Sequence, residues 1–294
     1  MPIAAPTLLC VHPHPDDESI ACGGTLARAA DAGIRTVVVT CTGGEEGENL
    51  AGIELGDVSL IEHRRQELAA ALAALGVGHH HWLGYRDSGM VETPANAHPN
   101  SFHLADVDEA ATRLATIVRA ERPQVVVSDG RDGTYGHPDH IKAYTVTVRA
   151  VDLAADPQAP VEGEPWKVAK RYVHTLGRRR LLAGHRALVE AGLASPFGDE
   201  VADDPVAIPF GAADEDITTE VDVGPWFDRK RAAMAAHRSQ IGTDSFFLNV
   251  PPELAGRFFG VEQFILEAGQ LGSAVPETDL FAGVLTSGPA GDRR

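Results

Sequence analysis

The sequence predicts an α/β fold: a Rossmann-like, mostly parallel sheet flanked by helices, with a smaller C-terminal α+β portion that shapes the pocket. Short β-rich runs alternate with longer helical patterns along the first half of the chain. Two of these runs, TLLCV and QVVVS, have continuously apolar centres, as expected of strands covered on both faces. Strands alternating with helices at this spacing favour a parallel sheet with crossover helices.

The first four elements are predicted from β-branched runs, from amphipathic periodicity and from glycines that end helices. They are a strand over Thr7–His12, a helix over Gly23–Ala32, a strand over Arg35–Cys41 and a helix over Glu62–Leu75. Gly33 and Gly76 directly follow the two helices, and glycine is the usual residue just after a helix because it adopts the left-handed conformation.

The next elements carry similar signals. They are a short strand over His81–Leu83, a helix over Val107–Glu121, a strand over Gln124–Ser128 and a helix that begins near Pro138. Pro123 stops the first of these helices. Pro138 suits the first position of the second, because proline lacks the N–H that would be left unpaired there.

Beyond Asp152 the pattern is looser. We expect a loop over Ala155–Trp166, a strand over Arg171–Leu176, a helix over Arg179–Ala191, irregular structure over Ser195–Asp216, a strand over Ile217–Val223 and a helix over Trp226–Ser239. The predicted organisation is a Rossmann-like catalytic domain over residues 1–176, a C-terminal portion over 177–286 that completes the fold and the pocket, and a flexible tail over 287–294.

Composition excludes several classes of protein. The 25 basic and 42 acidic residues give a net charge of −17, which opposes the positive surface that nucleic-acid binding needs. No stretch approaches the roughly 20 apolar residues of a membrane span, and no secretory signal follows Met1. Cys10, Cys22 and Cys41 lack the spacing of a disulfide framework and are expected as small buried residues. We therefore expect a cytoplasmic protein.

Two polar segments follow predicted strands, at the edge where parallel sheets bind ligands. One is HPHPDDE, from His12 to Glu18, and the other is YGHPDH, from Tyr135 to His140. Imidazole and carboxylate ligands with one position left for water are the pattern of a catalytic zinc site. Either segment alone is more often a turn or a helix cap, but two at one sheet edge favour a metal site.

The spacing within these segments predicts which side chains can face the same side and so share a metal ion. His14 and Asp17 are three apart around a proline that can start a helix, so both can point to one side, and His137 and His140 have the same spacing. Asp16 must point elsewhere, so one carboxylate can bind the metal while the other acts on the water. His12 is expected behind the ligands or in the core rather than as a fourth ligand.

The motifs HPHPDDES, VVVTCTGGEEGE, HRRQEL, YRDSGM and YGHPDH resemble those of the N-acetylglucosaminylphosphatidylinositol deacetylase family of zinc hydrolases. The resemblance is closest to its mycothiol-pathway branch, which contains the N-acetylglucosaminyl-inositol deacetylase and the mycothiol S-conjugate amidase. It is dense over about half the chain and sparse afterwards, where GTDSFFLNVPPEL is similar to the broader family.

The resemblance implies a role for each matching position. It gives the zinc ligands as His14, Asp17 and His140; the general base as Asp16; the carbonyl-polarising residue as Tyr135; the acid partner as His137, oriented by Asp139; and the substrate-binding residues as Arg64, Asp87 and Glu48. In the implied mechanism Asp16 deprotonates the attacking water while Tyr135 and His137 assist the oxyanion. A histidine beside Asp139 is expected to have a raised pKa and stay protonated.

The expected activity is removal of an N-acetyl group from a small aminosugar substrate, with N-acetylglucosaminyl-inositol in mycothiol biosynthesis as the first candidate. Alternatives left open are S-conjugate amidase activity, deacetylation of another N-acetyl aminosugar or antibiotic intermediate, and a non-catalytic metal- or sugar-binding module. A dinucleotide-binding oxidoreductase is disfavoured because no G-x-G-x-x-G follows the first strand. The sequence leaves open whether Fe²⁺ replaces Zn²⁺ and whether the chain forms a homo-oligomer.

Overall fold

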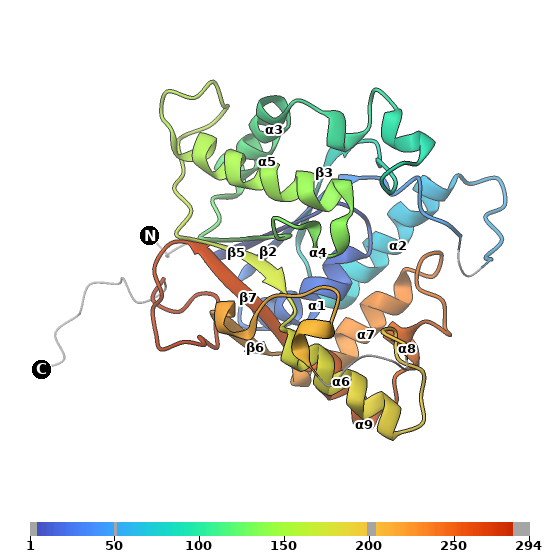
Figure 1. The fold of residues 1–294 in the computed structure, drawn as a ribbon. Coiled ribbons are helices and arrows are strands. Elements are labelled where there is room, and N and C mark those ends of the chain that lie inside the picture. Colours follow the sequence, from blue (N-terminus) through green and yellow to red (C-terminus); the bar gives the residue numbers. More distant parts are fainter. Residues whose placement is uncertain (1–4, 50–51, 199–203, 285–294) are drawn as a thin grey trace, which may run out of the picture.

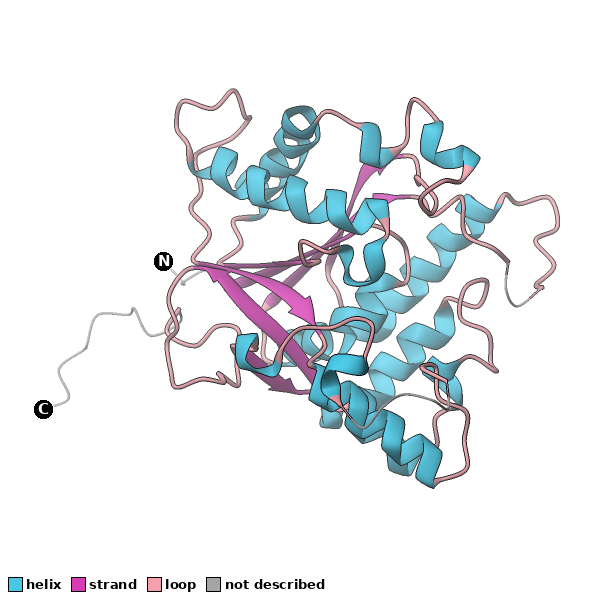
Figure 2. Ribbon diagram, viewed as in Figure 1, coloured by secondary structure: helices cyan, strands magenta, loops and turns pink. Residues whose placement is uncertain are grey.

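The computed structural model describes residues 5–49, 52–198 and 204–284. A seven-stranded sheet runs through the molecule with helices on both faces (Figures 1 and 2). The strands are β1 (Thr7–His12), β2 (Arg35–Thr42), β3 (His79–Tyr85), β4 (Val125–Ser128), β5 (Lys170–Thr175), β6 (Thr219–Asp222) and β7 (Val261–Ala268). The α-helices are α1 (Asp17–Asp31), α2 (Leu60–Leu75), α3 (Val107–Glu121), α4 (Gly133–Gly136), α5 (Pro138–Ala155), α6 (Arg178–Glu190), α7 (Phe227–Ala236), α8 (Phe246–Asn249) and α9 (Pro252–Phe259).

The strand order is β3-β2-β1-β4-β5-β7-β6. Strands β1 to β5 are parallel, and β7 pairs antiparallel with both β5 and β6. The predicted Rossmann-like, mostly parallel sheet is therefore confirmed. Because β4 pairs directly with β1, the loops that follow these two strands leave the same edge of the sheet side by side.

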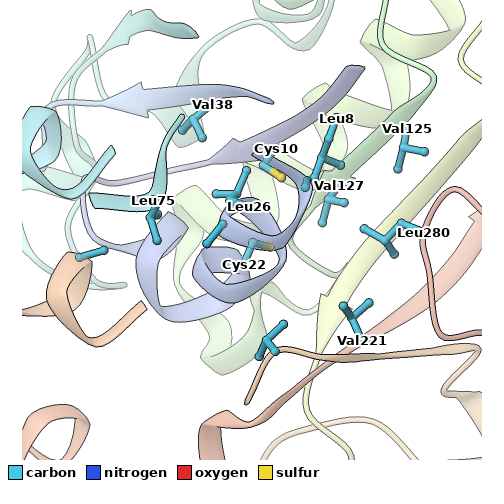
Figure 3. Close-up of a cluster of buried hydrophobic side chains, with 14 of the residues drawn as sticks. Leu8, Cys10, Cys22, Leu26, Val38, Leu75, Val125, Val127, Val221 and Leu280 are labelled. Atoms are coloured by element: carbon cyan, nitrogen blue, oxygen red, sulfur yellow. The ribbon is translucent and has the colours of Figure 1, made fainter. Parts of the chain in front are cut away.

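The two faces of the sheet form two apolar cores. Leu8 and Cys10 of β1 face one core, with α1, α2 and α7, while Leu9 and Val11 face the other, with α3 and α5. Figure 3 shows side chains of the first core. All three cysteines are buried free thiols in these cores, as the sequence predicts. Each fully buried leucine contributes about 1.5–3 kcal/mol to the free energy of folding.

Most predicted boundaries agree closely, and α1 is the main exception. We expected this helix to begin at Gly23, but it begins at Asp17, with acidic Asp17 and Glu18 in its first turn, where the helix dipole favours negative charge. The glycines lie inside the helix because of packing. A Cβ at Gly24 would overlap the side chain of Val223, so glycine permits the close approach of the segment after β6.

The C-terminal portion joins the same sheet, because β7 pairs with β5. Helices α6 and α9 pack against each other at the periphery (Figure 1). Sequence patterns indicated neither β7 nor α9, while α6 and β6 lie close to the predicted positions. The predicted tail over 287–294 lies outside the described residues. Among the described helices, none combines the length and apolar character needed to cross a membrane.

Candidate metal centre

The loops that follow β1 and β4 bring the two predicted motifs together. His14 lies in the first loop, Asp17 is the first residue of α1, and His140 lies in the first turn of α5. The Asp17 carboxylate faces both imidazoles: Oδ2 is 3.4 Å from Nδ1 of His14, and Oδ1 is 3.6 Å from Nε2 of His140. The two imidazole centroids are 5.3 Å apart. The Asp17 carboxylate therefore lies between the two imidazoles that were predicted with it as ligands.

The other ring nitrogens of these histidines face carboxylates that fix their orientation. Nε2 of His14 is 3.3 Å from Oδ2 of Asp139, and Nδ1 of His140 is 2.6 Å from Oδ1 of Asp129. Metal-binding histidines usually donate their second N–H to such a partner, which leaves the opposite nitrogen free for the ion. Two imidazoles and a carboxylate without thiolates suit Zn²⁺ or Fe²⁺, so the residues present fit a divalent cation.

A third imidazole lies beside this set. His14, His137 and His140 each offer a ring nitrogen within 4.8 Å of the other two. Burial lowers the pKa of His14, but hydrogen bonds with Asp139 and Asp17 outweigh burial and hold that pKa well above its usual value. Before a cation binds, the cluster therefore carries positive charge balanced by carboxylates, and a cation would replace that charge.

Asp16 lies at the N-terminus of α1 in an unusual backbone conformation, with φ 129°. A non-glycine residue at positive φ is strained, which is frequent at functional sites. Burial raises its pKa to about 6, partly opposed by the nearby Arg64 guanidinium. Its Oδ2 is 3.3 Å from Nη2 of Arg64. This carboxylate is therefore placed beside the centre and is distinct from Asp17.

Arg64 is buried, at 3% exposure, and its guanidinium is already engaged by protein groups. It donates hydrogen bonds to the backbone oxygens of Gly44 at 2.5 Å and Pro15 at 2.6 Å, besides its ion pair with Asp16. These contacts tie the loop after β2 to the loop that carries Asp16. The sequence indicated a sugar-binding role and missed this structural one.

The expected raised pKa of His137 is wrong, and Asp139 contacts this ring through its backbone rather than its carboxylate. The Asp139 carboxylate contacts His14 and accepts hydrogen bonds from the backbone N–H and the hydroxyl of Ser88. Only the backbone N–H of Asp139 reaches His137, at Nδ1 and 3.1 Å. Burial, reinforced by the charge on His14, lowers the pKa of His137 to about 4 instead of raising it. The neutral ring therefore carries its proton on Nε2.

Tyr135 lies over the imidazoles at the mouth of the site, with 56% of its surface exposed. Its hydroxyl is 3.4 Å from Nε2 of His140, and its ring packs at 5.1 Å from the His140 ring. The preceding Thr134 has φ 66°, which turns the chain sharply within α4. Burial raises the pKa of the Tyr135 phenol, so it stays a neutral hydrogen-bond donor.

The remaining predicted substrate-binding residues differ in their placement. Asp87 is 3% exposed; its Oδ1 accepts a hydrogen bond from Gly89 at 2.8 Å and lies 3.5 Å from Nε2 of His14. Glu48 is exposed on the loop after β2, where its backbone oxygen accepts a hydrogen bond from Gln240. Asp87 therefore belongs to the carboxylate surroundings of His14, while Glu48 stays at the surface.

Sequence reasoning missed Asp129 and His174. Asp129 is fully buried, and its Oδ1 accepts hydrogen bonds from His140 at 2.6 Å and from His174 at 3.1 Å. A signal was present, because Asp129 directly follows the predicted strand over 124–128 at the same sheet edge as the motifs. For His174, at the end of β5, the sequence holds no comparable signal, because its contact depends on the pairing of β4 with β5.

Two cavities lie along the carboxyl edge on either side of the histidines. One, of about 510 Å³, is lined on the β2–β3 side by residues that include Glu45, Tyr85 and Arg86. The other, of about 270 Å³, is lined on the β5 side by residues that include Thr134 and His174. The larger cavity, whose lining is mainly polar, offers space for a small hydrophilic molecule, whereas the lining of the smaller one is mainly apolar.

Comparison with known proteins gives a consistent family assignment. A sequence model described as "PIG-L: GlcNAc-PI de-N-acetylase" matches residues 9–151. The protein named 1D-myo-inositol 2-acetamido-2-deoxy-alpha-D-glucopyranoside deacetylase from Acidothermus cellulolyticus is 46% identical over 95% of this chain and 95% of its own length. The protein of the same name from Thermobispora bispora is 44% identical over 94% of this chain and 98% of its own.

Solved structures agree on the fold. A conserved protein from Thermus thermophilus superposes with a TM-score of 0.57 at 28% identity, covering 92% of this chain and 97% of its own. The N,N'-diacetylchitobiose deacetylase from Pyrococcus horikoshii gives a TM-score of 0.60 at 22% identity, covering 90% of this chain and 84% of its own, which supports the fold alone. By its near-complete alignment with relatives above 40% identity, the chain belongs to the GlcNAc-PI de-N-acetylase (PIG-L) family.

Proposed function

We propose that this protein is a metal-dependent hydrolase that removes the N-acetyl group from 1D-myo-inositol 2-acetamido-2-deoxy-α-D-glucopyranoside, the N-acetylglucosaminyl-inositol intermediate of mycothiol biosynthesis. Water and the amide react to give acetate and the free amine. The proposal is supported by the approach of the Asp17 carboxylate to both His14 and His140, in a chain 46% identical over nearly its whole length to a deacetylase of that name.

The proposed cation is held by His14, Asp17 and His140, with Zn²⁺ first and Fe²⁺ as the alternative. When bound, a divalent cation supplies Lewis acidity for the amide carbonyl and lowers the pKa of water. The orientation of its ligands comes from Asp139 behind His14 and from Asp129 behind His140. These partners keep the nitrogens that face Asp17 unprotonated when the cation is present.

Asp16 is the proposed general base. It is adjacent in sequence to Asp17, is held by Arg64, and lies in a strained backbone conformation. Burial brings its pKa to about 6, close to the operating range of a base near neutral pH. Asp16 takes a proton from the attacking water and then returns it to the nitrogen of the leaving amine, so the proton count closes within the site.

His137 and Tyr135 are the proposed hydrogen-bond donors to the oxyanion that develops on the amide carbonyl. The Asp139 backbone N–H donates to Nδ1 of His137, which leaves the Nε2 proton as the donor of a neutral ring. The Tyr135 hydroxyl lies at the mouth of the site and stays protonated. Donors positioned in advance favour the transition state because they need no reorganisation as charge develops.

The remaining polar groups are proposed to bind the substrate's hydroxyls. The family resemblance implies this role for Asp87, Arg64 and Glu48, and Asp87 lies 3.5 Å from Nε2 of His14. One donor remains available to a substrate, because Nε of Arg64 is buried without a partner among the described residues. The cavity beside Tyr85 and Arg86 provides space for a hydrophilic group such as an inositol ring.

The experiment is an amine-release assay with fluorescamine on the purified, zinc-loaded chain. The substrates are N-acetylglucosaminyl-inositol, free N-acetylglucosamine, a mycothiol S-conjugate and an N-acylated glycopeptide antibiotic. We expect the first to react with the highest kcat/KM. Faster reaction of the conjugate or the antibiotic would replace the proposed substrate. Zinc binding with no hydrolysis of any of them would support a non-catalytic module instead. The cytoplasmic location expected from the sequence remains a prediction for cell fractionation.

A further inference from the structure

His12 is a buried polar residue whose two ring nitrogens lack ordinary hydrogen-bond partners. It ends β1 and is completely shielded from solvent, yet neither Nδ1 nor Nε2 has a nitrogen or oxygen partner among the described residues, and its ring meets the Cys10 thiol instead. Buried polar atoms are paired in the great majority of proteins, and an exception indicates an ion or an ordered water at that place. An imidazole without a nitrogen or oxygen partner among these residues is therefore a candidate ligand.

Asp129 has the same property on the neighbouring strand end. Its Oδ1 is occupied by Nδ1 of His140 and Nε2 of His174, whereas Oδ2 is buried and lacks a partner among the described residues. A carboxylate oxygen that is removed from water and unpaired is costly unless a proton donor or cation faces it. The unpaired oxygen and the unpaired imidazole come from β4 and β1, which are adjacent in the sheet.

His174 completes a set with these two residues. His12, Asp129 and His174 each offer a ligand atom within 4.8 Å of the other two, and the rings of His12 and His174 are 5.8 Å apart. We propose that these residues form a second site for a divalent transition-metal ion, separate from the set of His14, Asp17 and His140. Two imidazoles and one carboxylate are ligands that Zn²⁺, Co²⁺ and Fe²⁺ accept.

Access to this second site comes from the β5 side. His174 and Thr134 line the cavity of about 270 Å³, and the exposed Arg131 lies at its wall, so the cavity reaches the surface. The His174 side chain retains 11% exposure. A cation can therefore enter past His174, and waters in the cavity can complete its coordination. The ligands themselves remain mostly shielded, which favours binding over free exchange with solvent.

A competing set on the other side of His12 is less suitable. Cys10 and Cys22 also offer ligand atoms within 4.8 Å of His12. Both cysteines are fully buried in the apolar core with Leu8 and Leu26, and burial raises the pKa of the Cys22 thiol, which disfavours the thiolate that a metal ion needs (Figure 3). His12 also meets the Cys10 thiol, so the two sets compete for its nitrogens and variants on both sides are needed to separate them.

The second site is coupled to the first through Asp129. One carboxylate oxygen orients His140 and the other is free for the second cation, so both centres share this side chain. Occupation of the second site fixes the Asp129 carboxylate and with it the ring of His140. The second cation is thus a positioning element for the first centre, and its presence can be measured without any assay of hydrolysis.

The test is a count of bound zinc on the full chain. Apoprotein prepared with a chelator is dialysed against Zn²⁺, and the metal-to-protein ratio is measured by mass spectrometry. We expect two equivalents for the native chain and one for His174→Ala. His12→Gln is a second variant with the same expected loss, and circular dichroism checks that both fold. His80→Ala is the matched control: it removes an imidazole from β3 of the same sheet and should retain two equivalents.

Other results would overturn the second site. One equivalent in the native chain would mean that water satisfies His12 and Asp129. Two equivalents in His174→Ala would place the second ion elsewhere. Loss of one equivalent in Cys10→Ser with no loss in His174→Ala would assign it to the thiol side, where Co²⁺ substitution would add a thiolate charge-transfer band. None of these outcomes bears on whether the chain hydrolyses N-acetyl amides, which the amine-release assay decides separately.

Discussion

Two regions of the molecule bury charged groups, and they treat them differently. Beside β7, Lys230 pairs with Glu262 at 2.6 Å, and the same carboxylate accepts hydrogen bonds from the backbone N–H groups of Gly24 and Thr25 at 2.8 Å. At the ends of β1 and β4, His12 and one oxygen of Asp129 have no nitrogen or oxygen partner among the described residues. Both regions are shielded from water to a similar degree.

Burial of charge does not by itself mark a functional site. Both oxygens of the Glu262 carboxylate accept hydrogen bonds from protein groups. The Lys230–Glu262 pair therefore connects β7 to α1 and α7. At the carboxyl edge of the sheet, the His12 nitrogens and Oδ2 of Asp129 remain available to bind a cation or water from outside the chain. Incomplete pairing, rather than burial, therefore separates a binding site from a structural ion pair.

The largest change is expected at the candidate metal centre, when the proposed general base Asp16 is removed. Asp16→Ala should lower kcat by about 10²–10⁴-fold, because the water loses its proton acceptor. Zinc content should be unchanged, because Asp16 is not among the proposed ligands. Amine release and metal analysis on the same preparation measure both quantities. Asp57→Ala, at an exposed carboxylate, is the control, and near-normal turnover by Asp16→Ala would remove this residue from the mechanism.

The region beside β7 is tested by breaking the Lys230–Glu262 ion pair. Lys230→Met should lower the free energy of unfolding by about 3–5 kcal/mol, because Glu262 is left as a buried charge without its cation. Zinc affinity and turnover per folded molecule should stay the same. Denaturant unfolding gives the first quantity. Arg231→Met, at the exposed neighbour, should change stability by about 0.5 kcal/mol or less. Equal effects of the two variants would contradict the role given to the pair.

A smaller effect is expected at the carboxylate that supports His140. Asp129→Ala should weaken the affinity of the proposed catalytic centre for zinc by about 10–100-fold, because the imidazole loses the partner that fixes its orientation. Competition with a chromophoric chelator measures this affinity. Asp132→Ala, at an exposed position in the same loop, should leave it unchanged. An unaltered zinc affinity in Asp129→Ala would show that His140 needs no support.

An effect of similar size concerns pH and the buried carboxylate of Glu277. Glu277 bonds Lys170, Tyr172 and the backbone N–H of Gly272. Burial raises the pKa of Glu277, but these bonds outweigh burial and keep the pKa below its usual 4.5. Its contribution to stability is therefore present above about pH 4.5 and is lost as the pH falls through the lowered value.

Glu277→Gln makes this linkage measurable. The variant should be less stable than the native chain by about 1.5–3 kcal/mol at neutral pH, and the difference should shrink in acid. Urea unfolding from about pH 7 to about pH 3 follows the difference. A gap that stays constant across this range would mean that the carboxylate titrates alike in the folded and unfolded chains.

Local signals explain how much of the fold could be predicted. The strand over Thr7–His12 and the helix over Val107–Glu121 have the predicted bounds, because apolar runs, caps and proline stops lie within the elements themselves. The start of α1 was misplaced because Gly23 and Gly24 suggested a boundary, whereas their cause is packing against Val223. Strand β7 was missed because its partners, β5 and β6, are distant along the chain.

The candidate site divides in the same way. Its motifs follow predicted strands, so the meeting of His14, Asp17 and His140 could be expected from topology. The partner of each side chain could not, since the Asp139 carboxylate contacts His14, and only its backbone N–H reaches His137. The pKa of His137 depends on burial and on neighbouring charges, neither of which a motif specifies. The roles proposed from resemblance for the substrate-binding residues stay predictions.

The pairing of β1 with β4 has a consequence for the chain if it were divided. A cut between β3 and α3 would give two fragments, one with His14 and Asp17 and the other with His140, so neither alone offers the whole ligand set. An ion that binds only the reassembled pair shifts the equilibrium towards association. The zinc dependence of fragment complementation would therefore report, in a single titration, how strongly the centre holds the two halves of the sheet together.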